Sequence, residues 1–274
     1  MNQYSSVDLS EFSGVGNWKR TQLKLVFHFY CQTPFGKLDG RNKDVIDLAK
    51  IIGRTPGAVA MKLGNFASLD PVIVASGRSG LSNASKLDKE IWDEFHLDWE
   101  GLAVECAQLR EHLLEKHYLQ ESDFGIADNE IERPDYFGET RESIVQTRIK
   151  QQFFRRAVLS SYGTRCCMSG VPDSRLLVAS HIVPWRDDKA NRLNPSNGLC
   201  LSVIHDRAFD QRLISLSDDL RVMLSRSLQA THCDYLRMTF HSLEGRQIES
   251  ADRFAADPRF IASHRQLFLQ QEAT

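Results

Sequence analysis

The chain has 274 residues, 42% of them hydrophobic, and a formal net charge of −2 at pH 7. This length suffices for two domains of ordinary size with buried cores, so disulfides are not needed for folding. No run of about 18 apolar residues occurs, and the first residues lack the pattern of a secretory signal. We therefore expect a soluble cytoplasmic protein without a membrane-spanning segment.

The six cysteines are scattered along the chain and include no Cys-x-x-Cys pair. This spacing argues against a disulfide framework and against a structural zinc site. We expect the cysteines to be small buried side chains. They are Cys31, Cys106, Cys166, Cys167, Cys200 and Cys233.

The charges are distributed unevenly. Residues 88–135 contain 15 acidic and 4 basic residues, a balance of −11, whereas residues 141–215 contain 6 acidic and 12 basic residues, a balance of +6. A polyanion is held by Lys and Arg side chains, so the basic segment is the part that a nucleic acid would contact. The alternative is that this modest surplus only forms a solvated surface.

The N-terminal half is predicted to be mostly helical. Residues 17–30 have apolar side chains at helical spacing, with Asn17 as the N-cap. Residues 44–52 and 57–66 show the same periodicity and are separated by a few residues, which indicates two helices joined by a tight turn.

The turn between these two helices has a clear start signal for the second one. Thr55 suits the N-cap, and Pro56 suits the first helical position. The unit resembles a helix-turn-helix, in which the second helix would lie in the major groove of DNA with Arg54 and Lys62 near phosphates or base edges. The alternative is a plain helical hairpin, because such hairpins are common without any DNA contact.

The middle of the chain contains a loop, a long helix and a linker. Residues 71–85 are punctuated by Gly and Ser and are predicted to be a loop. A helical pattern follows over residues 86–119, and the polar, acidic residues after it are typical of a linker. We therefore divide the chain into a helical domain at 1–120, a linker at 121–140 and a second domain at 141–274.

The second domain is predicted to open with a basic helix and a β-hairpin. The helix spans residues 141–161, and its cations include Arg148, Arg155 and Arg156, which either contact phosphates or are solvated. Two short apolar runs at 165–170 and 176–181 flank a turn, which is the pattern of a hairpin whose second strand ends at His181.

A helix is predicted to follow this hairpin. After a polar loop, residues 199–209 are apolar enough to begin a helix that carries His205. The result would be a ββα unit, with His181 at the end of a strand and His205 on the helix.

Four motifs in this region carry a resemblance to a known family. They are Arg-x-x-Gln-x-x-Phe-Arg at 148–155, Ser-His-Ile-Val-Pro-Trp at 180–185, Asn-Gly-Leu-Cys-Leu at 197–201 and His-Asp-Arg-Ala-Phe-Asp at 205–210. With these motifs the chain resembles the HNH endonucleases of the ββα-metal fold, and more narrowly a bacterial subgroup found among restriction and defence nucleases. The resemblance covers about residues 141–216.

The resemblance implies a metal-dependent DNA endonuclease. In the family the first histidine is the general base and the last is a metal ligand, and these roles correspond to His181 and His205. Asn197 occupies the middle position, where its amide would fix the loop that holds His181. Phosphodiester hydrolysis needs such a base, together with a divalent metal that neutralises developing charge. Arg207 joins the arginines and Lys62 as an expected nucleic-acid contact.

The metal shell departs from the family pattern. Ser180 stands where many members have an Asp that is a second metal ligand. Asp206 is the nearest candidate for that ligand, but on a helix Asp206 and Asp210 point about 100° or more away from His205, which favours capping or ion pairing. A site with few protein ligands suits Mg²⁺, with Mn²⁺ as the alternative.

The predicted architecture is therefore α+β, with a mostly helical N-terminal domain followed by a C-terminal ββα-metal nuclease domain. DNA is the expected partner, and restriction or phage defence is the expected role. One HNH site cuts one strand, so double-strand cleavage would need a homodimer or two successive nicks. The alternative function is a DNA-binding regulator with a degenerate nuclease domain, although the presence of all motif residues favours the enzyme.

Overall fold

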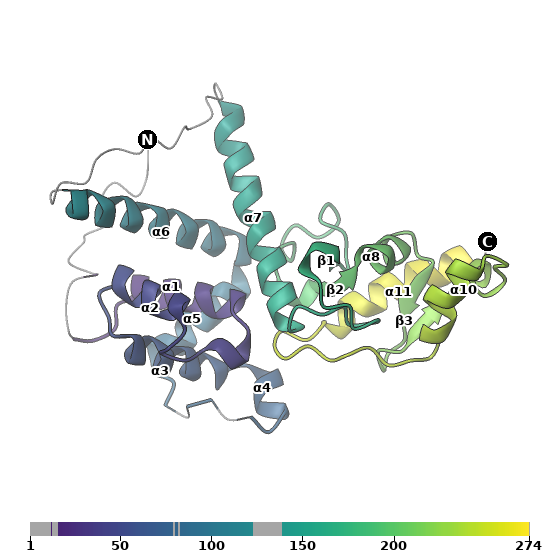
Figure 1. Cartoon of the computed structure of the whole chain (residues 1–274), viewed down its shortest axis with the longest axis horizontal. Helices are drawn as coiled ribbons and strands as arrows, with labels where there is room; N and C mark the ends of the chain where they lie inside the picture. Colours follow the sequence, from purple (N-terminus) through teal and green to yellow (C-terminus); the bar gives the residue numbers. More distant parts are fainter. Residues whose placement is uncertain (1–11, 13–15, 79, 82, 123–138, 274) are drawn as a thin grey trace. The chain divides into compact units, whose positions relative to one another are not determined.

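The structure is a computed structural model that describes residue 12 and residues 16–78, 80–81, 83–122 and 139–273 (Figure 1). For residues 115–122 and 139–144 it describes the course of the helix but not the side chains. The chain divides into two compact units. Unit 1 comprises the described parts of residues 1–69 and 77–153, and unit 2 comprises residues 70–76 with the described residues from 154 onward.

Unit 1 is helical. Its elements are α1 (Arg20–Gln32), the short 3₁₀ helix η2 (Phe35–Lys37), α2 (Lys43–Ile51), α3 (Pro56–Ala67), α5 (Lys86–Leu97), α6 (Trp99–Ser122) and the first part of α7 (Glu139–Ser161). Helix α1 packs against α3, α5 and α6. Phe27 of α1 lies at the centre of the core, where its ring contacts Phe66, Phe95 and Trp99.

The capping residues explain where these helices begin. As predicted, Thr55 caps α3 by accepting a hydrogen bond from the Ala58 N–H (3.2 Å), and Pro56 is its first residue. The predicted cap at Asn17 is wrong. The N-cap of α1 is Lys19, two residues later, and the Gln22 side chain accepts a hydrogen bond from the backbone N–H of Lys19 (3.1 Å).

Two further helix boundaries differ from the predictions. The single helix predicted for residues 86–119 is broken at Asp98, whose carboxylate accepts a hydrogen bond from the Gly101 N–H (2.8 Å) at the start of α6. Within the predicted loop, Pro71–Ala75 form the short helix α4, which Asp70 caps through the Val72 N–H (3.0 Å). The predicted linker lies largely outside the described residues, and the contacts divide the two units within α7, after Phe153.

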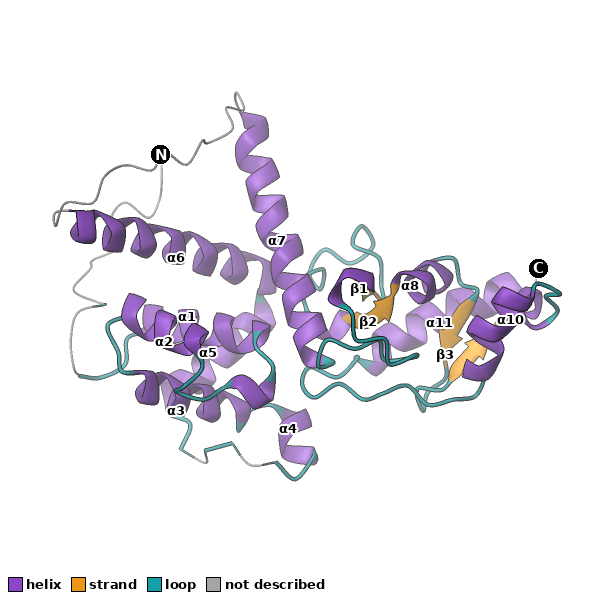
Figure 2. Ribbon diagram, viewed as in Figure 1, coloured by secondary structure: helices purple, strands orange, loops and turns teal. Residues whose placement is uncertain are grey.

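Unit 2 combines the end of α7 with two small antiparallel sheets and several helices (Figure 2). Its further elements are η3 (Ser174–Leu176), β1 (Leu177–His181), η4 (Pro195–Asn197), β2 (Gly198–Ser202), α8 (Val203–Asp210), β3 (Ile214–Leu216), β4 (Val222–Leu224), α9 (Arg226–Gln229), α10 (Asp234–Phe240), η5 (His241–Leu243) and α11 (Pro258–Glu272). Strand β1 pairs with β2, and β3 pairs with β4. Helix α8 packs against both strands of the first sheet and against β3, while α11 packs against β3.

The ββα unit is present, but its strands differ from the predicted ones. Residues 165–170 form turns instead of a strand, and β1 is the first strand of the hairpin. Its partner β2 lies beyond the long loop of residues 182–197, in a segment predicted as helix. All five residues of β2 are buried, and a fully buried strand has the same continuous apolar sequence as a buried helix.

The overall class agrees with the sequence. The combination of many helices with two small sheets confirms the predicted α+β architecture, with the ββα unit in the C-terminal half. Among the helices in the described part of the chain, none has the length and apolarity that a bilayer crossing requires.

Candidate active site

The site is built where β1 ends. His181 is the last residue of β1 and lies opposite Gly198 in the antiparallel register. The loop of residues 182–197 leaves the sheet and returns at this point, and the Ile182 N–H donates to the Asn197 carbonyl (3.0 Å) to close it. The strand end is therefore a fixed point on a rigid hairpin, and it presents His181 toward the loop.

His181 is held in one orientation by two aromatic rings and one hydrogen bond. Its ring stacks on Phe154 of α7, with centroids 3.9 Å apart and planes at 9°, and meets Trp185 edge to face at 5.6 Å. Its Nε2 lies 2.9 Å from the Arg192 carbonyl oxygen. A carbonyl can only accept, so Nε2 carries the hydrogen and Nδ1 keeps its lone pair.

The environment of His181 also favours its neutral form. Burial lowers the pKa of His181, while the hydrogen bond to the Arg192 carbonyl and the negative charge of Asp210 oppose this shift without overcoming it. A neutral imidazole with a free Nδ1 can accept a proton. An imidazole held in this way could take a proton from a neighbouring group.

Gly198 allows Phe154 to reach this histidine. A Cβ atom at position 198 would overlap Cγ2 of Val158 and would lie only 3.0 Å from Cζ of Phe154. Both are side chains of α7, and Phe154 is the ring that stacks on His181. The absence of a side chain at 198 is what lets α7 approach the end of β1.

Asn197 lies beneath the loop and is fully buried. Its Oδ1 accepts from the Val183 N–H (2.8 Å), and its Nδ2 donates to the carbonyls of Val183 (3.1 Å) and Asn191 (3.3 Å). These bonds join both arms of the loop. They are the contacts expected of a residue that fixes the loop instead of touching a substrate.

Two carboxylates on α8 face the end of β1. Asp206 and Asp210 are four residues apart and so share one face of the helix. Burial raises the pKa of both carboxyls, and the negative charge of Asp210 raises the pKa of Asp206 further. The neighbouring Ser180 partly lowers the pKa of Asp206, and Arg207 and His181 partly lower that of Asp210. Asp206 thus lies near Ser180, and Asp210 lies within electrostatic range of His181.

His205 lies on a different face of α8. Its side chain is buried, its Nδ1 lies 2.9 Å from Oγ of Ser202 and 3.4 Å from Sγ of Cys166, and its ring meets Phe240 edge to face. None of these contacts is shared with His181. Successive helical residues are rotated by about 100°, so a helix that turns Asp206 toward β1 turns His205 into the core.

His181 and His205 thus have separate contacts: His181 lies against the loop at the end of β1, and His205 lies with Ser202 and Cys166 in a buried cluster. Asp206, which the sequence offered as a further candidate ligand, and Asp210 lie on α8, the helix that packs against β1. In the described ranges, no group of three or more His, Cys, Asp or Glu side chains is arranged to hold a metal ion. A cation at this site would be held by the two carboxylates and completed by water or phosphate oxygens.

A thiol lies beneath α8, next to His205. Burial alone would raise the pKa of the Cys166 thiol, but hydrogen bonds from His205, Ser169 and Ser202 lower it to about 6. Among the described atoms, Nε2 of His205 has no hydrogen-bond partner. His205 thus belongs to a buried polar cluster that anchors the start of α8.

The predicted cations fall into two groups. Arg54, Lys62 and Arg155 have structural partners, whereas Arg148, Arg156 and Arg207 are exposed. Arg155 donates to the carbonyls of Leu177 (2.8 Å) and Ser174 (2.8 Å), and so fastens α7 to the start of β1.

The two cations of the predicted helix-turn-helix are engaged within unit 1. Arg54 donates to the carbonyls of Gly16 and Asn17 (both 2.8 Å) and lies over the Trp18 ring. Lys62 is buried in an ion pair with Asp88 (2.8 Å). Helices α2 and α3 form the predicted helical pair, but the side chains of Arg54 and Lys62 bind other residues of unit 1.

Sequence reasoning missed three parts of the site. Phe154, Trp185 and the Arg192 carbonyl all contact His181. Phe154 and Trp185 stand within the motifs at 148–155 and 180–185, so their place in a motif was the available signal. A backbone carbonyl such as that of Arg192 leaves no signal in a sequence.

Comparison with known families supports the interpretation of this unit. A family model described as HNH endonuclease matches residues 166–217. The match contains β1, the loop, β2 and α8, but it excludes Phe154 of α7 and the whole of α11. A search of curated proteins finds no match to the chain.

Proposed function

We propose that the chain is a metal-dependent DNA endonuclease with His181 as its general base, because residues 166–217 match the family model described as HNH endonuclease. The observation that carries the proposal is the geometry of His181. Its Nε2–H is engaged with the Arg192 carbonyl (2.9 Å), while Nδ1 is free to accept a proton. Asp206 and Asp210 lie on α8, which packs against β1, the strand that carries His181.

In the proposed reaction His181 activates water. Nδ1 takes a proton from the water molecule, whose oxygen attacks phosphorus while the bond to the leaving oxygen breaks. The imidazolium that forms keeps its Nε2–H on the Arg192 carbonyl, which stabilises the positive charge. Phe154 and Trp185 restrict the rotation of the ring, so the lone pair stays directed at the attacking water.

Asp206 and Asp210 would hold the divalent cation. Burial and mutual repulsion raise the pKa of Asp206 in the protein alone, so a cation placed there would relieve an unfavourable arrangement. HNH nucleases typically use a divalent metal, and two carboxylates with remaining water positions suit Mg²⁺, with Mn²⁺ as the alternative. Such a cation would neutralise charge on the phosphate and stabilise the leaving oxygen.

The exposed cations of unit 2 would contact the DNA backbone. Arg156 on α7, Arg207 on α8, and Arg186 and Lys189 in the loop are exposed and lie in the basic part of the sequence. Contacts of this kind place a duplex without reading its sequence. Restriction or phage defence stays a prediction, since it rests on the resemblance of the motifs alone.

The test is cleavage of a supercoiled plasmid with Mg²⁺ and with excess EDTA. His181→Ala is compared with wild type and with His232→Ala, which removes an exposed histidine of the same unit. Loss of a general base should slow cleavage by about 10²–10⁴-fold, while His232→Ala should cleave like wild type and EDTA should stop both active proteins. Equal cleavage by wild type and His181→Ala would show that another group is the base. A wild type that is inactive with Mg²⁺ and also with Mn²⁺ would favour the DNA-binding regulator.

A further inference from the structure

We propose that Asp188 and Asn191 are positioning residues for the general base, because they hold the Arg192 carbonyl against His181. The proposal rests on the function proposed above. The carbonyl is the only polar atom that contacts the His181 ring among the hydrogen bonds of the described residues. Its position depends on a loop that has no regular secondary structure between Ile182 and Asn194. Something must therefore fix the peptide that carries it.

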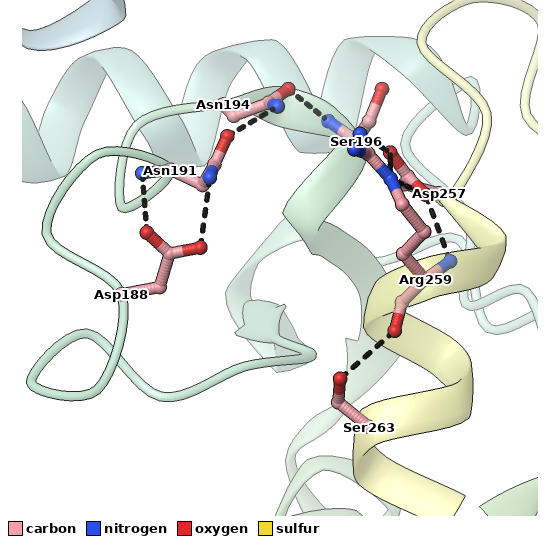
Figure 3. A network of polar contacts seen from close by, with 7 residues as sticks. All are labelled: Asp188, Asn191, Asn194, Ser196, Asp257, Arg259 and Ser263. Carbon is pink, nitrogen blue, oxygen red and sulfur yellow. Dashed lines mark hydrogen bonds and ion pairs between the residues drawn. The ribbon is translucent and has the colours of Figure 1, made fainter.

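Asn191 immediately precedes Arg192 and is bonded on every side. Its N–H and Nδ2 both donate to the Asp188 carboxylate, at 3.1 and 2.8 Å, and its Oδ1 accepts from Nδ2 of Asn194 at 3.1 Å. Its carbonyl accepts from Nδ2 of Asn197. Figure 3 shows the Asp188 carboxylate spanning the backbone and the side chain of Asn191. The residue that precedes Arg192 is thus fixed through both its backbone and its side chain.

The same polar network continues to the C-terminal helix. Asn194 accepts from the Ser196 N–H (3.0 Å), and the Ser196 carbonyl accepts from the N–H of Asp257 (3.0 Å). Asp257 caps α11 through the Arg259 N–H (2.8 Å). Figure 3 shows these residues as one connected line from the loop to α11. The network therefore ties the loop to a helix that lies outside the segment matched by the family model.

The carbonyl needs this support for a physical reason. An irregular loop samples many backbone conformations, and ordering each residue costs about 1–2 kcal/mol. If the Arg192 carbonyl moves, Nε2 of His181 loses its acceptor, and the ring hydrogen can then reside on Nδ1, which could no longer accept a proton from water. Groups that orient an imidazole through its second nitrogen typically change activity by about 10–100-fold when they are removed.

The test exchanges the two side chains. Asp188→Asn replaces the acceptor of the Asn191 amide with an amide, and Asn191→Asp places two carboxylates in contact. Each single variant should lower kcat about 10–100-fold while the KM for DNA stays within about twofold. The double variant Asp188→Asn/Asn191→Asp restores a donor–acceptor pair, since residue 188 then donates and residue 191 accepts. It should recover kcat to within about threefold of wild type.

A matched control and a second readout separate positioning from folding. Asp219→Asn removes an exposed carboxylate of another loop of unit 2 and should leave kcat unchanged. In DNA-free protein, ¹⁵N NMR should show His181 protonated at Nε2 in wild type and in the double variant, but mixed tautomers in the single variants. This signature does not depend on cleavage, so it tests the positioning role even if the chain is not a nuclease.

The outcomes are distinct. Single variants with wild-type kcat and an unchanged His181 tautomer would overturn the proposal. So would a double variant that recovers thermal stability but neither kcat nor the tautomer, because the pair would then only stabilise the loop. A normal tautomer pattern in a wild type that cleaves no DNA would leave the positioning role in place and overturn the nuclease instead.

Discussion

At the scale of single residues, the adjacent side chains of His205 and Asp206 on α8 have different surroundings. Asp206 faces the end of β1, whereas His205 is anchored in the core by Cys166 and Ser202. The motif at 205–210 identifies the helix but not its rotation, because sequence fixes only the angle of about 100° between successive side chains. The groups that set the rotation, Cys166 and Phe240, lie far from α8 in the sequence. The motif could therefore nominate both His205 and Asp206 as metal ligands but could not indicate which of the two side chains is buried.

The different surroundings of His205 and Asp206 predict separable effects. Asp206→Asn should lower cleavage by about 10²-fold or more and raise the Mg²⁺ concentration needed, with little change in thermal stability. His205→Gln should instead destabilise the protein by about 1–3 kcal/mol, because it disturbs a buried polar cluster, and should keep the same Mg²⁺ requirement. Mg²⁺ titrations of the cleavage rate and thermal unfolding curves measure both. An unchanged Mg²⁺ requirement in Asp206→Asn, with a raised one in His205→Gln, would restore the ligand assignment to the histidine.

At the scale of elements, the end of β1 was predictable and its partner was not. The motif around His181 marks the end of a strand, and strand β1 does end there. Its pairing with β2 spans the loop of residues 182–197, and such a non-local contact leaves no local pattern. Helix starts with a capping side chain, such as Thr55, were predicted correctly because capping is a local interaction.

Helix α11 is held to the rest of unit 2 by a buried histidine. His264 lies 2.9 Å from Oγ of Ser215 through Nδ1 and 3.0 Å from the Phe209 carbonyl through Nε2, and its ring stacks on that of Phe209. Burial lowers its pKa from 6.5 to about 4. The unfolded chain therefore binds the proton first on acidification, so stability is complete above about pH 6.5 and falls as the pH drops toward about 4.

This link makes the stability of unit 2 depend on pH. Between about pH 7.5 and about pH 5, His264 should account for a loss of about 2 kcal/mol in the free energy of unfolding. His264→Gln should be less stable than wild type near pH 7.5 but should lose about 2 kcal/mol less on going to pH 5. Urea unfolding at the two pH values measures this difference. Equal pH dependence in both proteins would mean that other groups carry it.

In unit 1, a buried ion pair joins α3 to α5, and its removal should lower the free energy of unfolding. Asp88 is fully buried, accepts from Lys62 (2.8 Å), and also accepts from the Ser85 N–H (2.8 Å) at the start of α5. Asp88→Ala should cost about 3–5 kcal/mol, because it leaves a buried ammonium without its partner. Lys62→Met should leave DNA affinity unchanged. A loss of affinity in Lys62→Met at unchanged stability would support the predicted contact of this lysine with DNA.

At the scale of the whole molecule, the described chain contains one HNH unit and therefore one candidate base. A single encounter with a duplex should break one strand, so nicked plasmid should accumulate before linear plasmid appears. A time course on agarose gels at several protein concentrations measures the order of the products. Linear plasmid that forms without a nicked intermediate, at a rate rising with the square of the protein concentration, would instead indicate a dimer that cuts both strands together.

Gly198 has a further consequence for how such a chain can lose its activity. The position carries no reactive group, yet a single methyl group there would overlap Val158 and press on Phe154, the ring that stacks on His181. A substitution at 198 should thus disturb the candidate active site while every chemically reactive residue of the motif stays in place. A chain with such a substitution would keep every reactive residue of the motif. The change would be visible only in the distance between α7 and the end of β1.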